Sequence, residues 1–492
     1  MNHRVRPLQA AAFCALVSAG VGAVRADQPT TQPSDISGEI QALRARIDQL
    51  EKQQKDQDLK IKQEAQKQQE DVTTRSVLND ADRRSRLFDA EDITAGYKDH
   101  RFYISGDDGN FVWRPWLHIQ FREVTLDRQD FKTKTDDEID NGFEMRRTRF
   151  GFDGNLFTPD FTYFVNWATV RASGTSNVTN SAGAKIGTVS NNLGGVPLLE
   201  ESWAKYNFHD TPFYLKAGQI KDPLLHDQIV SSRYQHGIER SLTADIFANG
   251  DAFTEAATFI YDPKTWVRTE AGVNHGLRSA NTNFFDFPTQ NSFNYGVAGR
   301  AEFKLFGRWQ DYAEVGGIEI KDPLLVFGVG VDYSERGHAG QTVAVADAQY
   351  AMPNGINFYG AVVDRYTNHN FGIATQSPTG ASIAAPTAAV ANHATNEYSV
   401  VGEAGYVFNN FIEPYGRVEY MHLMGTAAGS NNWIQIYTAG VNFFFQGNRL
   451  KVTPQIIYLP RGIPIDDGPN DIYTSAPGRG EIMGEIQLQW LL

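Results

Sequence analysis

The chain has 492 residues, a formal net charge of −13 at pH 7 and one cysteine, and 12% of its residues are aromatic. The acidic balance argues against a nucleic-acid partner. The cysteine, Cys14, falls in an expected leader, so disulfides, thiol catalysis and cysteine-bound metals are excluded for the mature chain.

An export leader is expected at residues 1–26. Arg4 and Arg6 give it a positive start, the apolar run Leu8–Val24 follows, and small residues then offer a cleavage site. The run is short and terminal, which favours a signal peptide over a membrane helix. A linker rich in Pro, Thr and Gln occupies residues 27–35.

Residues 36–72 carry a helical pattern. The apolar positions alternate steps of four and three residues, at Ile36, Ile40, Leu43, Ile47 and Leu50. Charged and Gln residues fill the positions between them, which predicts a short periplasmic coiled coil. The alternative is a solvated single helix, because the seam turns polar after Leu50. A connector at residues 73–110 follows.

From about residue 111 the apolar period changes to two. Sixteen segments show it: Trp116–Leu126, Phe143–Asp153, Phe161–Val170, Glu201–Phe208, Phe213–Ile220, Phe253–Tyr261, Trp266–His275, Ser292–Phe306, Leu325–Tyr333, Gln341–Ala351, Ile356–Tyr366, Glu397–Phe408, Tyr415–Leu423, Trp433–Gln446, Leu450–Leu459 and Ile482–Leu492. A further segment, Tyr312–Ile320, breaks the loop rhythm and is assigned to an excursion on the periplasmic side. An even strand number lets a closed barrel keep both chain ends on one side.

The connections between these segments alternate in length. Short ones such as His209–Pro212 and Gly447–Arg449 take turns with long ones such as Arg171–Glu200 and Thr367–Asn396. Short turns at one rim and long loops at the other are typical of outer-membrane barrels. The sequence therefore predicts an all-β fold, a transmembrane antiparallel β-barrel of about sixteen strands over residues 111–492, preceded by the helical coiled coil.

The last segment shows how the two faces of a strand are assigned. Ile486 and Leu488 point to one face, whereas Glu485 and Gln487 point to the other. Lipid on one side and a wet lumen on the other require this pattern. We therefore expect outer-membrane lipid around the barrel and polar side chains inside it.

The same alternation places basic side chains in the lumen. With Lys221 and Arg240 of the long connection after Ile220 included, the expected pore-lining or anion-binding cations are Arg122, Arg147, Arg149, Lys205, Lys216, Lys221, Arg240, Arg268, Arg300 and Lys304. Fixed cations can replace part of the hydration of a small anion such as phosphate. Alternatively, they only pair with lumen carboxylates such as Glu270 and Glu302. Arg146 has the opposite parity and is expected to snorkel near the rim.

The connection Lys221–Ala252 is too long for a simple hairpin loop. It could fold into the lumen and set the constriction, or it could lie on the surface, and the sequence leaves both open. Its two histidines, His226 and His236, lack a carboxylate or cysteine at a matching spacing, so no metal site is predicted. Hydrolase, metalloprotease and P-loop motifs are also missing, so neither catalysis nor a cofactor is expected.

Three stretches resemble the phosphate-selective porin O and P family. They are Phe143–Phe152, Leu215–Pro223 with Gly237–Ser241, and the hairpin Thr438–Thr453. The likeness covers about residues 111–492 and implies a sixteen-stranded homotrimeric porin whose lumen cations guide anions. The terminal Leu492 departs from the aromatic residue that outer-membrane assembly usually prefers.

These observations lead to one main expectation and two alternatives. The main expectation is a porin in the outer membrane of a Gram-negative-type bacterium, allowing passive diffusion of small anions, with phosphate among the candidates. The first alternative is a structural or adhesive outer-membrane protein that tethers the envelope through its coiled coil. The second is a barrel enzyme, such as a lipid hydrolase, for which no residue set is nominated.

Overall fold

The structure is a computed structural model. It describes residues 93–98, 100–128, 139–169, 173–179, 185–192, 197–248, 253–277, 295–336, 339–368, 375–376, 382–383, 394–424, 433–461 and 480–492, preceded by Gly38, Ala45, Arg46, Gln49, Lys52 and Lys55. The chain divides into two units, Met1–Ala90 and Glu91–Leu492. The six described residues of the first unit are helical and exposed. The rest of the expected leader, linker, coiled coil and early connector lies outside the described residues, so these assignments stay predictions.

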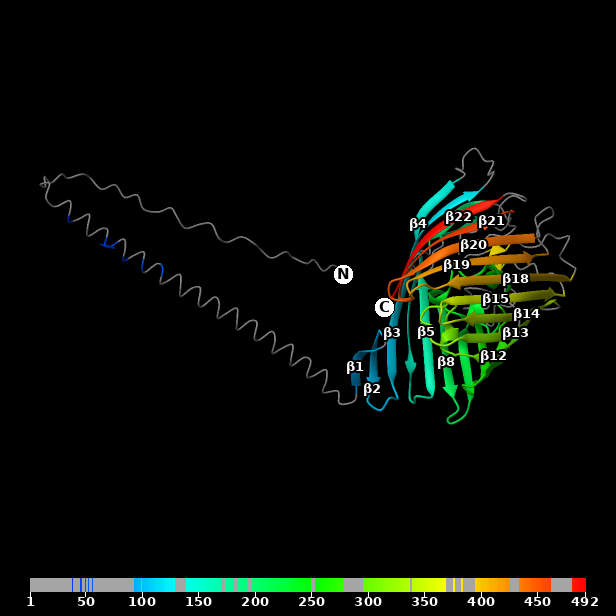
Figure 1. Ribbon diagram of the computed structural model, residues 1–492, viewed down its shortest axis with the longest axis horizontal. Coiled ribbons are helices and arrows are strands. Elements are labelled where there is room, and N and C mark those ends of the chain that lie inside the picture. Colours follow the sequence, from blue (N-terminus) through cyan, green and yellow to red (C-terminus); the bar gives the residue numbers. More distant parts are fainter. Residues whose placement is uncertain are drawn as a thin grey trace. The chain divides into compact units, whose positions relative to one another are not determined.

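The second unit is a closed antiparallel β-barrel (Figure 1). Its main sheet has eighteen strands. The first two, β1 (Ile93–Lys98) and β2 (Arg101–Gly106), form a hairpin that pairs with the start of β3 (Val112–Arg128). The other sixteen form a ring, which closes where β22 (Glu481–Leu491) pairs with β3.

The remaining strands of the ring follow one another in chain order. They are β4 (Ile139–Asn155), β5 (Phe161–Thr169), β8 (Pro197–Asn207), β9 (Phe213–Ile220), β10 (Thr254–Tyr261), β11 (Val267–Asn274), β12 (Tyr295–Phe306), β13 (Leu324–Arg336), β14 (Ala339–Ala351), β15 (Ile356–Thr367), β18 (Thr395–Tyr406), β19 (Ile412–His422), β20 (Trp433–Phe444) and β21 (Leu450–Leu459). Each of the sixteen predicted strands overlaps one of these, so the predicted strand set is confirmed.

Two smaller hairpins were not expected from the sequence. The long connection after β5 contains the pair β6 (Ser173–Thr179) and β7 (Lys185–Asn192). The long connection after β15 contains the two-residue strands β16 (Thr375–Gln376) and β17 (Ser382–Ile383). Both additions lie in connections at the rim of long loops, so they leave the order of the ring unchanged.

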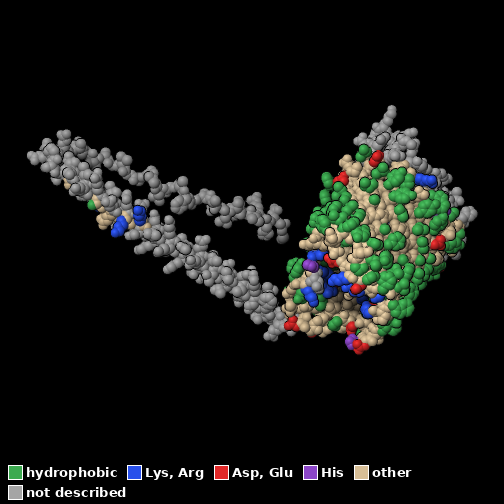
Figure 2. All heavy atoms as spheres, in the orientation of Figure 1, with side chains coloured by type: hydrophobic (Ala, Val, Ile, Leu, Met, Phe, Trp, Pro, Cys, Tyr) green, Lys and Arg blue, Asp and Glu red, His purple; other side chains and the backbone are tan. Residues whose placement is uncertain are grey.

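The outer face of the barrel is apolar, as the strand alternation predicts. In β22, Ile486 is 53% exposed and Leu488 37%, whereas Glu485 and Gln487 are buried. Hydrophobic side chains cover much of the visible outer wall (Figure 2). A wall of this kind suits contact with the hydrocarbon of a membrane.

The segment after β9 folds into the lumen, which answers the question that the sequence left open. This lumen segment, residues 221–248, contains α2 (His226–Ile229), the 3₁₀ turn η1 (Ser232–Tyr234) and α3 (Leu242–Phe247). Ser241 caps α3, because its side chain accepts a hydrogen bond from the Ala244 N–H. Nearly all of the lumen segment is buried.

An apolar core holds the lumen segment against one half of the barrel wall. Leu242, Ile246 and Phe247 of α3 cluster with wall residues such as Val343 and Ile436. These apolar contacts therefore anchor the lumen segment to this part of the wall.

The segment Tyr312–Ile320 forms no strand, as predicted. It belongs to the excursion, residues 307–323, between β12 and β13, where η2 (Asp311–Ala313) provides a short 3₁₀ turn. Tyr312 is buried with Leu324 of β13, and the Val315 N–H donates to the Tyr234 carbonyl at 2.9 Å. The excursion therefore contacts the lumen segment from the rim of short turns.

Candidate functional site

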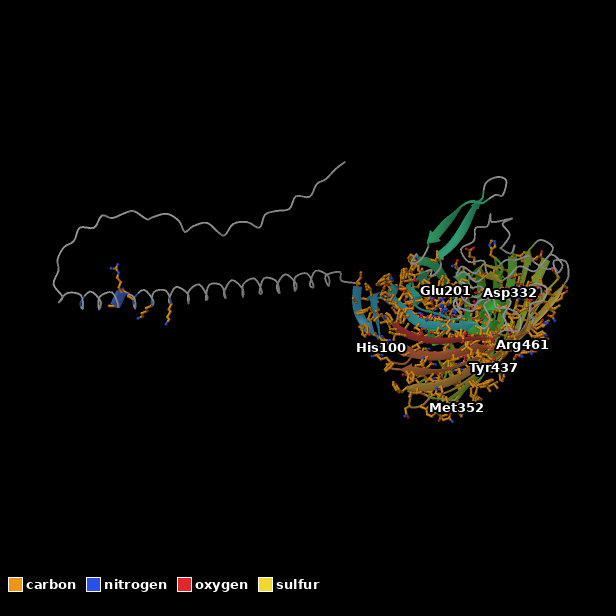
Figure 3. The ribbon with its side chains drawn as sticks, turned by 90° about the horizontal axis from the view of Figure 1, so that it is seen from above. His100, Glu201, Asp332, Met352, Tyr437 and Arg461 are labelled. Atoms are coloured by element: carbon orange, nitrogen blue, oxygen red, sulfur yellow. The ribbon has the colours of Figure 1, made fainter. Side chains whose placement is uncertain are left out.

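A cavity of about 190 Å³ lies between the lumen segment and the wall formed by β3 to β11. We name it the lumen cavity. Its lining consists of Trp116, His118, Arg149, Phe164, Asn166, Glu200, Glu201, Trp203, Lys216, Lys221, Pro223, Ile229, Ser231, Arg233, Phe253 and Glu270. Glu201, on β8, is labelled in Figure 3, and Figure 2 shows a hollow in the barrel with Lys and Arg side chains gathered around it.

Three of the ten predicted cations line this cavity, and two of them have carboxylate partners. Arg149 pairs with Glu200 at 2.7 Å and also donates to the Ser232 hydroxyl. Lys216 pairs with Glu270. The third, Lys221, donates to the carbonyls of residues 228, 229 and 230 at 3.0–3.1 Å and so caps α2.

Two further predicted cations lie over aromatic rings. The Lys205 ammonium lies 5.2 Å from the centroid of the Tyr214 ring, and that of Lys304 lies 5.2 Å from the Trp309 ring. Neither has a carboxylate within ion-pair distance among the residues that the structure describes. Both are partly exposed on the lumen side of their strands.

Arg122 and Arg147 converge on Glu239 of the lumen segment. Arg147 donates to both carboxylate oxygens, at 3.1 and 2.6 Å, and Arg122 donates to one at 3.0 Å. Arg122 also pairs with Glu144 and with Glu485. These cations fix the lumen segment to β3 and β4, and their charges are balanced by nearby carboxylates.

Arg146 also reaches Glu239, so the expectation that it snorkels near the rim is wrong. A bulge in β4 explains the error, because Gln120 of β3 pairs with Arg147 and the next residue, Phe121, pairs with Met145. The skipped Arg146 turns inward beside Arg147 and is 6% exposed. Upstream of the bulge the alternation resumes, with Met145 on the outside.

The last three predicted cations also pair with carbonyls or carboxylates of the lumen segment and the barrel wall. Arg240 donates to the Val230 carbonyl at 2.9 Å and to the Asp227 carbonyl at 3.2 Å. Arg300 forms a bidentate pair with Asp347 at 2.7 and 2.8 Å. Arg268 pairs with Glu302 and lies 4.4 Å from the Trp309 ring centroid.

A cation absent from the predicted set, Arg233, takes a central place in the cavity. Its guanidinium lies 4.7 Å from the Trp116 ring centroid, and its Nε donates to the Ser231 hydroxyl at 3.1 Å. No carboxylate of the described chain lies within ion-pair distance of it. Arg233 lies in the long connection Lys221–Ala252, where strand parity assigns no face to a side chain.

The aromatic lining was missed as well. Trp116 and Trp203 have the same strand parity as His118 and Lys205, which were assigned to the lumen. The parity signal was therefore present in the sequence. The predicted set of lumen residues contains only Arg and Lys, so it does not include these rings.

At the rim of short turns, Glu314 of the excursion is a second group of interest. Its side chain accepts a hydrogen bond from the Asn448 amide at 2.9 Å. Burial raises the pKa of Glu314 to about 7, against opposing effects from Lys451 and from that hydrogen bond. The carboxyl therefore titrates near neutral pH.

In the described part of the chain, no group of three or more His, Cys, Asp or Glu side chains is arranged to hold a metal ion. Within the same residues, no helix is both long and apolar enough to cross a membrane.

The closed ring of sixteen strands, its apolar outer face and its polar inner face form a porin-like β-barrel. A family model agrees: that of phosphate-selective porin O and P matches residues 118–303. The resemblance seen in the sequence is thus confirmed over this range, which holds the arginine-rich β4 and the lumen segment. A comparison with curated proteins finds no match.

Several solved structures resemble the chain. The anion-selective porin from Comamonas acidovorans is 8% identical, with a TM-score of 0.49, covering 77% of this chain and 99% of that one. OmpF of Salmonella typhi is 14% identical, with a TM-score of 0.47 and coverages of 81% and 100%. The channel DcaP of Acinetobacter baumannii is 10% identical, with a TM-score of 0.45 and coverages of 77% and 97%. At such low identities these likenesses say nothing about the solute.

Proposed function

We propose that the protein is a porin for passive diffusion of small anions, phosphate among them, across the outer membrane of a Gram-negative-type bacterium. One observation carries the proposal. The lumen cavity contains the guanidinium of Arg233, which has no carboxylate partner in the described chain. An anion that enters the passage meets a cation whose charge is not already balanced.

The charges around the cavity support a preference of modest size. Its lining has four cations, Arg149, Lys216, Lys221 and Arg233, and three carboxylates, Glu200, Glu201 and Glu270. Most of these charges pair with one another, so the excess is a single positive charge. An excess this small raises the local anion concentration without trapping the ion, which passive diffusion requires.

The position of the lumen segment explains how so few charges can select. Its apolar side chains pack against wall residues of β14 to β22, whereas the lumen cavity lies along β3 to β11. Salt screens charges over about 8 Å at physiological ionic strength, and an ion in a narrow cavity stays within that distance of Arg233. Selectivity should therefore be strongest at low salt.

A substitution of Arg233 tests the proposal. Arg233→Gln removes the unbalanced charge and should move the reversal potential in asymmetric potassium chloride towards potassium, by most at low salt. Arg461→Gln is the matched control, because Arg461 is exposed beyond β21 and lines no part of the cavity (Figure 3). A wild-type barrel that prefers potassium, or an unchanged reversal potential in Arg233→Gln, would contradict the proposal.

The assembly is proposed on the family resemblance. We expect a homotrimer, with the coiled coil of residues 36–72 in the periplasm. Crosslinking of the full-length protein in native membranes measures the stoichiometry directly. A structural or adhesive protein would form a barrel that stays closed in a planar bilayer, so a stable conductance excludes that alternative.

A further inference from the structure

Three aromatic side chains line the lumen cavity side by side, and we name them the aromatic ladder: Trp116 on β3, Phe164 on β5 and Trp203 on β8. The ring centroids of Trp116 and Phe164 are 5.9 Å apart, with an interplanar angle of 22°. Those of Phe164 and Trp203 are 5.7 Å apart, at 17°. Passage of a hydrated inorganic ion needs no such apolar strip.

Glycines on the intervening strands make the ladder continuous. Trp116 and Phe164 are separated by β4, where Gly151 pairs with Trp116. A Cβ on Gly151 would lie 2.9 Å from the Trp116 ring and 2.3 Å from the Val165 carbonyl oxygen. The absence of a side chain therefore lets the indole extend across β4 towards Phe164.

The second glycine lies at the other end of the ladder. Gly218 of β9 pairs with Trp203 and has a φ of +137°. A Cβ there would lie 2.2 Å from the Ser202 carbonyl oxygen. The close approach of the β8 backbone therefore admits no side chain at this position beside Trp203.

Two hydrogen-bond donors, the Arg233 guanidinium and the Trp116 indole N–H, lie at the Trp116 end of the ladder. The Arg233 guanidinium lies 4.7 Å from the Trp116 ring centroid, and among the described residues its only hydrogen-bond partner is the Ser231 hydroxyl. The buried indole N–H of Trp116 has no partner among the described residues. A cation and an N–H donor therefore adjoin an apolar ring surface, and both can donate to a bound anion.

We infer that the lumen cavity binds aromatic monocarboxylates, with the ring on the aromatic ladder and the carboxylate at Arg233. The inference rests on the proposed function, since it names a solute class for the same passage. The single excess positive charge matches one carboxylate. The volume of about 190 Å³ exceeds the roughly 150 Å³ cavity that holds benzene in another protein.

Calorimetric titration of the full-length protein in detergent tests this without requiring an open channel. The ligands are benzoate, acetate, inorganic phosphate and benzyl alcohol, at constant ionic strength. Benzoate should bind about tenfold more tightly than acetate, because stacking on aromatic side chains adds affinity of that size. Equal affinity for benzoate and acetate overturns the inference.

Variants test separately whether the aromatic ladder binds the benzoate ring and whether Arg233 binds its carboxylate. Trp203→Leu and Phe164→Leu should each weaken benzoate binding about five- to tenfold and leave acetate binding unchanged. Arg233→Gln should weaken benzoate but not benzyl alcohol. Trp167→Leu is the matched control, because Trp167 stacks on Phe150 at 5.6 Å in a pair that lies on the other face of β5 and β4.

The outcomes distinguish failure of the aromatic-monocarboxylate inference from failure of the proposed anion passage. If benzoate binding survives both ladder substitutions, the ladder does not bind the ring and the inference is wrong. If one ladder variant fails to fold, judged by heat-modifiable migration on gels, the other still gives the answer. Reversal potentials of the wild type test anion passage separately, so a chloride-selective barrel that treats benzoate like acetate refutes this inference alone.

Discussion

Glu239 accepts hydrogen bonds from Arg122, Arg146 and Arg147, guanidinium groups of two neighbouring strands. All four side chains are at most 6% exposed. Desolvating such charges is costly, and their mutual contacts offset the cost only while every partner is present. Arginines that would suit an anion pore by parity alone are thus committed to holding the lumen segment in place.

Glu239→Gln should free the lumen segment from β3 and β4. Removing one partner of a buried ion pair costs on the order of 3 kcal/mol, so the thermal unfolding midpoint should fall and the single-channel current should become larger and noisier. Glu123→Gln is the control. Glu123 follows Arg122 on β3, is partly exposed and accepts a hydrogen bond from the Thr125 hydroxyl. Unchanged stability and unchanged current noise together would show that Glu239 does not anchor the segment.

Strand parity predicted the inward position of Arg122, Arg147 and Arg149, because one apolar neighbour on each side fixes the face of a β-residue. It failed at Arg146, since a bulge is a local shift in pairing with the partner strand and leaves no periodic signal. It was silent on Arg233 and on the carboxylate partners, because those contacts join residues far apart in sequence. Eight of the ten predicted cations were placed by this rule, whereas Lys221 and Arg240 were taken from the long connection; the role of all ten in selecting anions stays a prediction.

At the scale of elements, the strands were predictable and the segments inside the barrel were not. Alternation over eight or more residues specifies a strand in a two-sided environment, so all sixteen were found. The lumen segment has short helices of four and six residues, which are too brief to leave a helical period. Its inward course depends on apolar wall residues such as Val343 and Ile436, which only the closed ring brings together.

The excursion should respond to pH through Glu314. Its pKa is raised to about 7 in the fold, above the ordinary value of 4.5. The protonated carboxyl thus contributes stability that is complete below about pH 4.5 and is lost as pH rises through 7. Relative to Glu314→Gln, the wild type should have an unfolding midpoint that falls between pH 5 and pH 8.

The control for this measurement lies on the same excursion. Asp322 is exposed and is not among the charges that shift the pKa of Glu314, so Asp322→Asn should show the same pH dependence as the wild type. A constant difference in unfolding midpoint between the wild type and Glu314→Gln from pH 5 to pH 8 would mean that the Glu314 carboxyl does not titrate in this range.

For the whole molecule, the alternation of short turns and long connections defines two rims. Epitope tags inserted after Gly183 and after Ala385, in two long connections, should be labelled on intact cells. A tag after Asp210, in the short turn between β8 and β9, should be labelled only after the envelope is permeabilised. Labelling of the Asp210 tag alone on intact cells would invert this orientation.

Ring closure has a consequence for how the chain is made. Gln120 of β3 and Gln489 of β22 bond across the closing seam at 2.8 Å, although they are 369 positions apart. No partial product can therefore seal the cylinder, and both edge strands keep unsatisfied amides until translation and export of the last residues. Contacts of such long range make folding slow. A truncation that removes only β22 should therefore leave an aggregation-prone sheet.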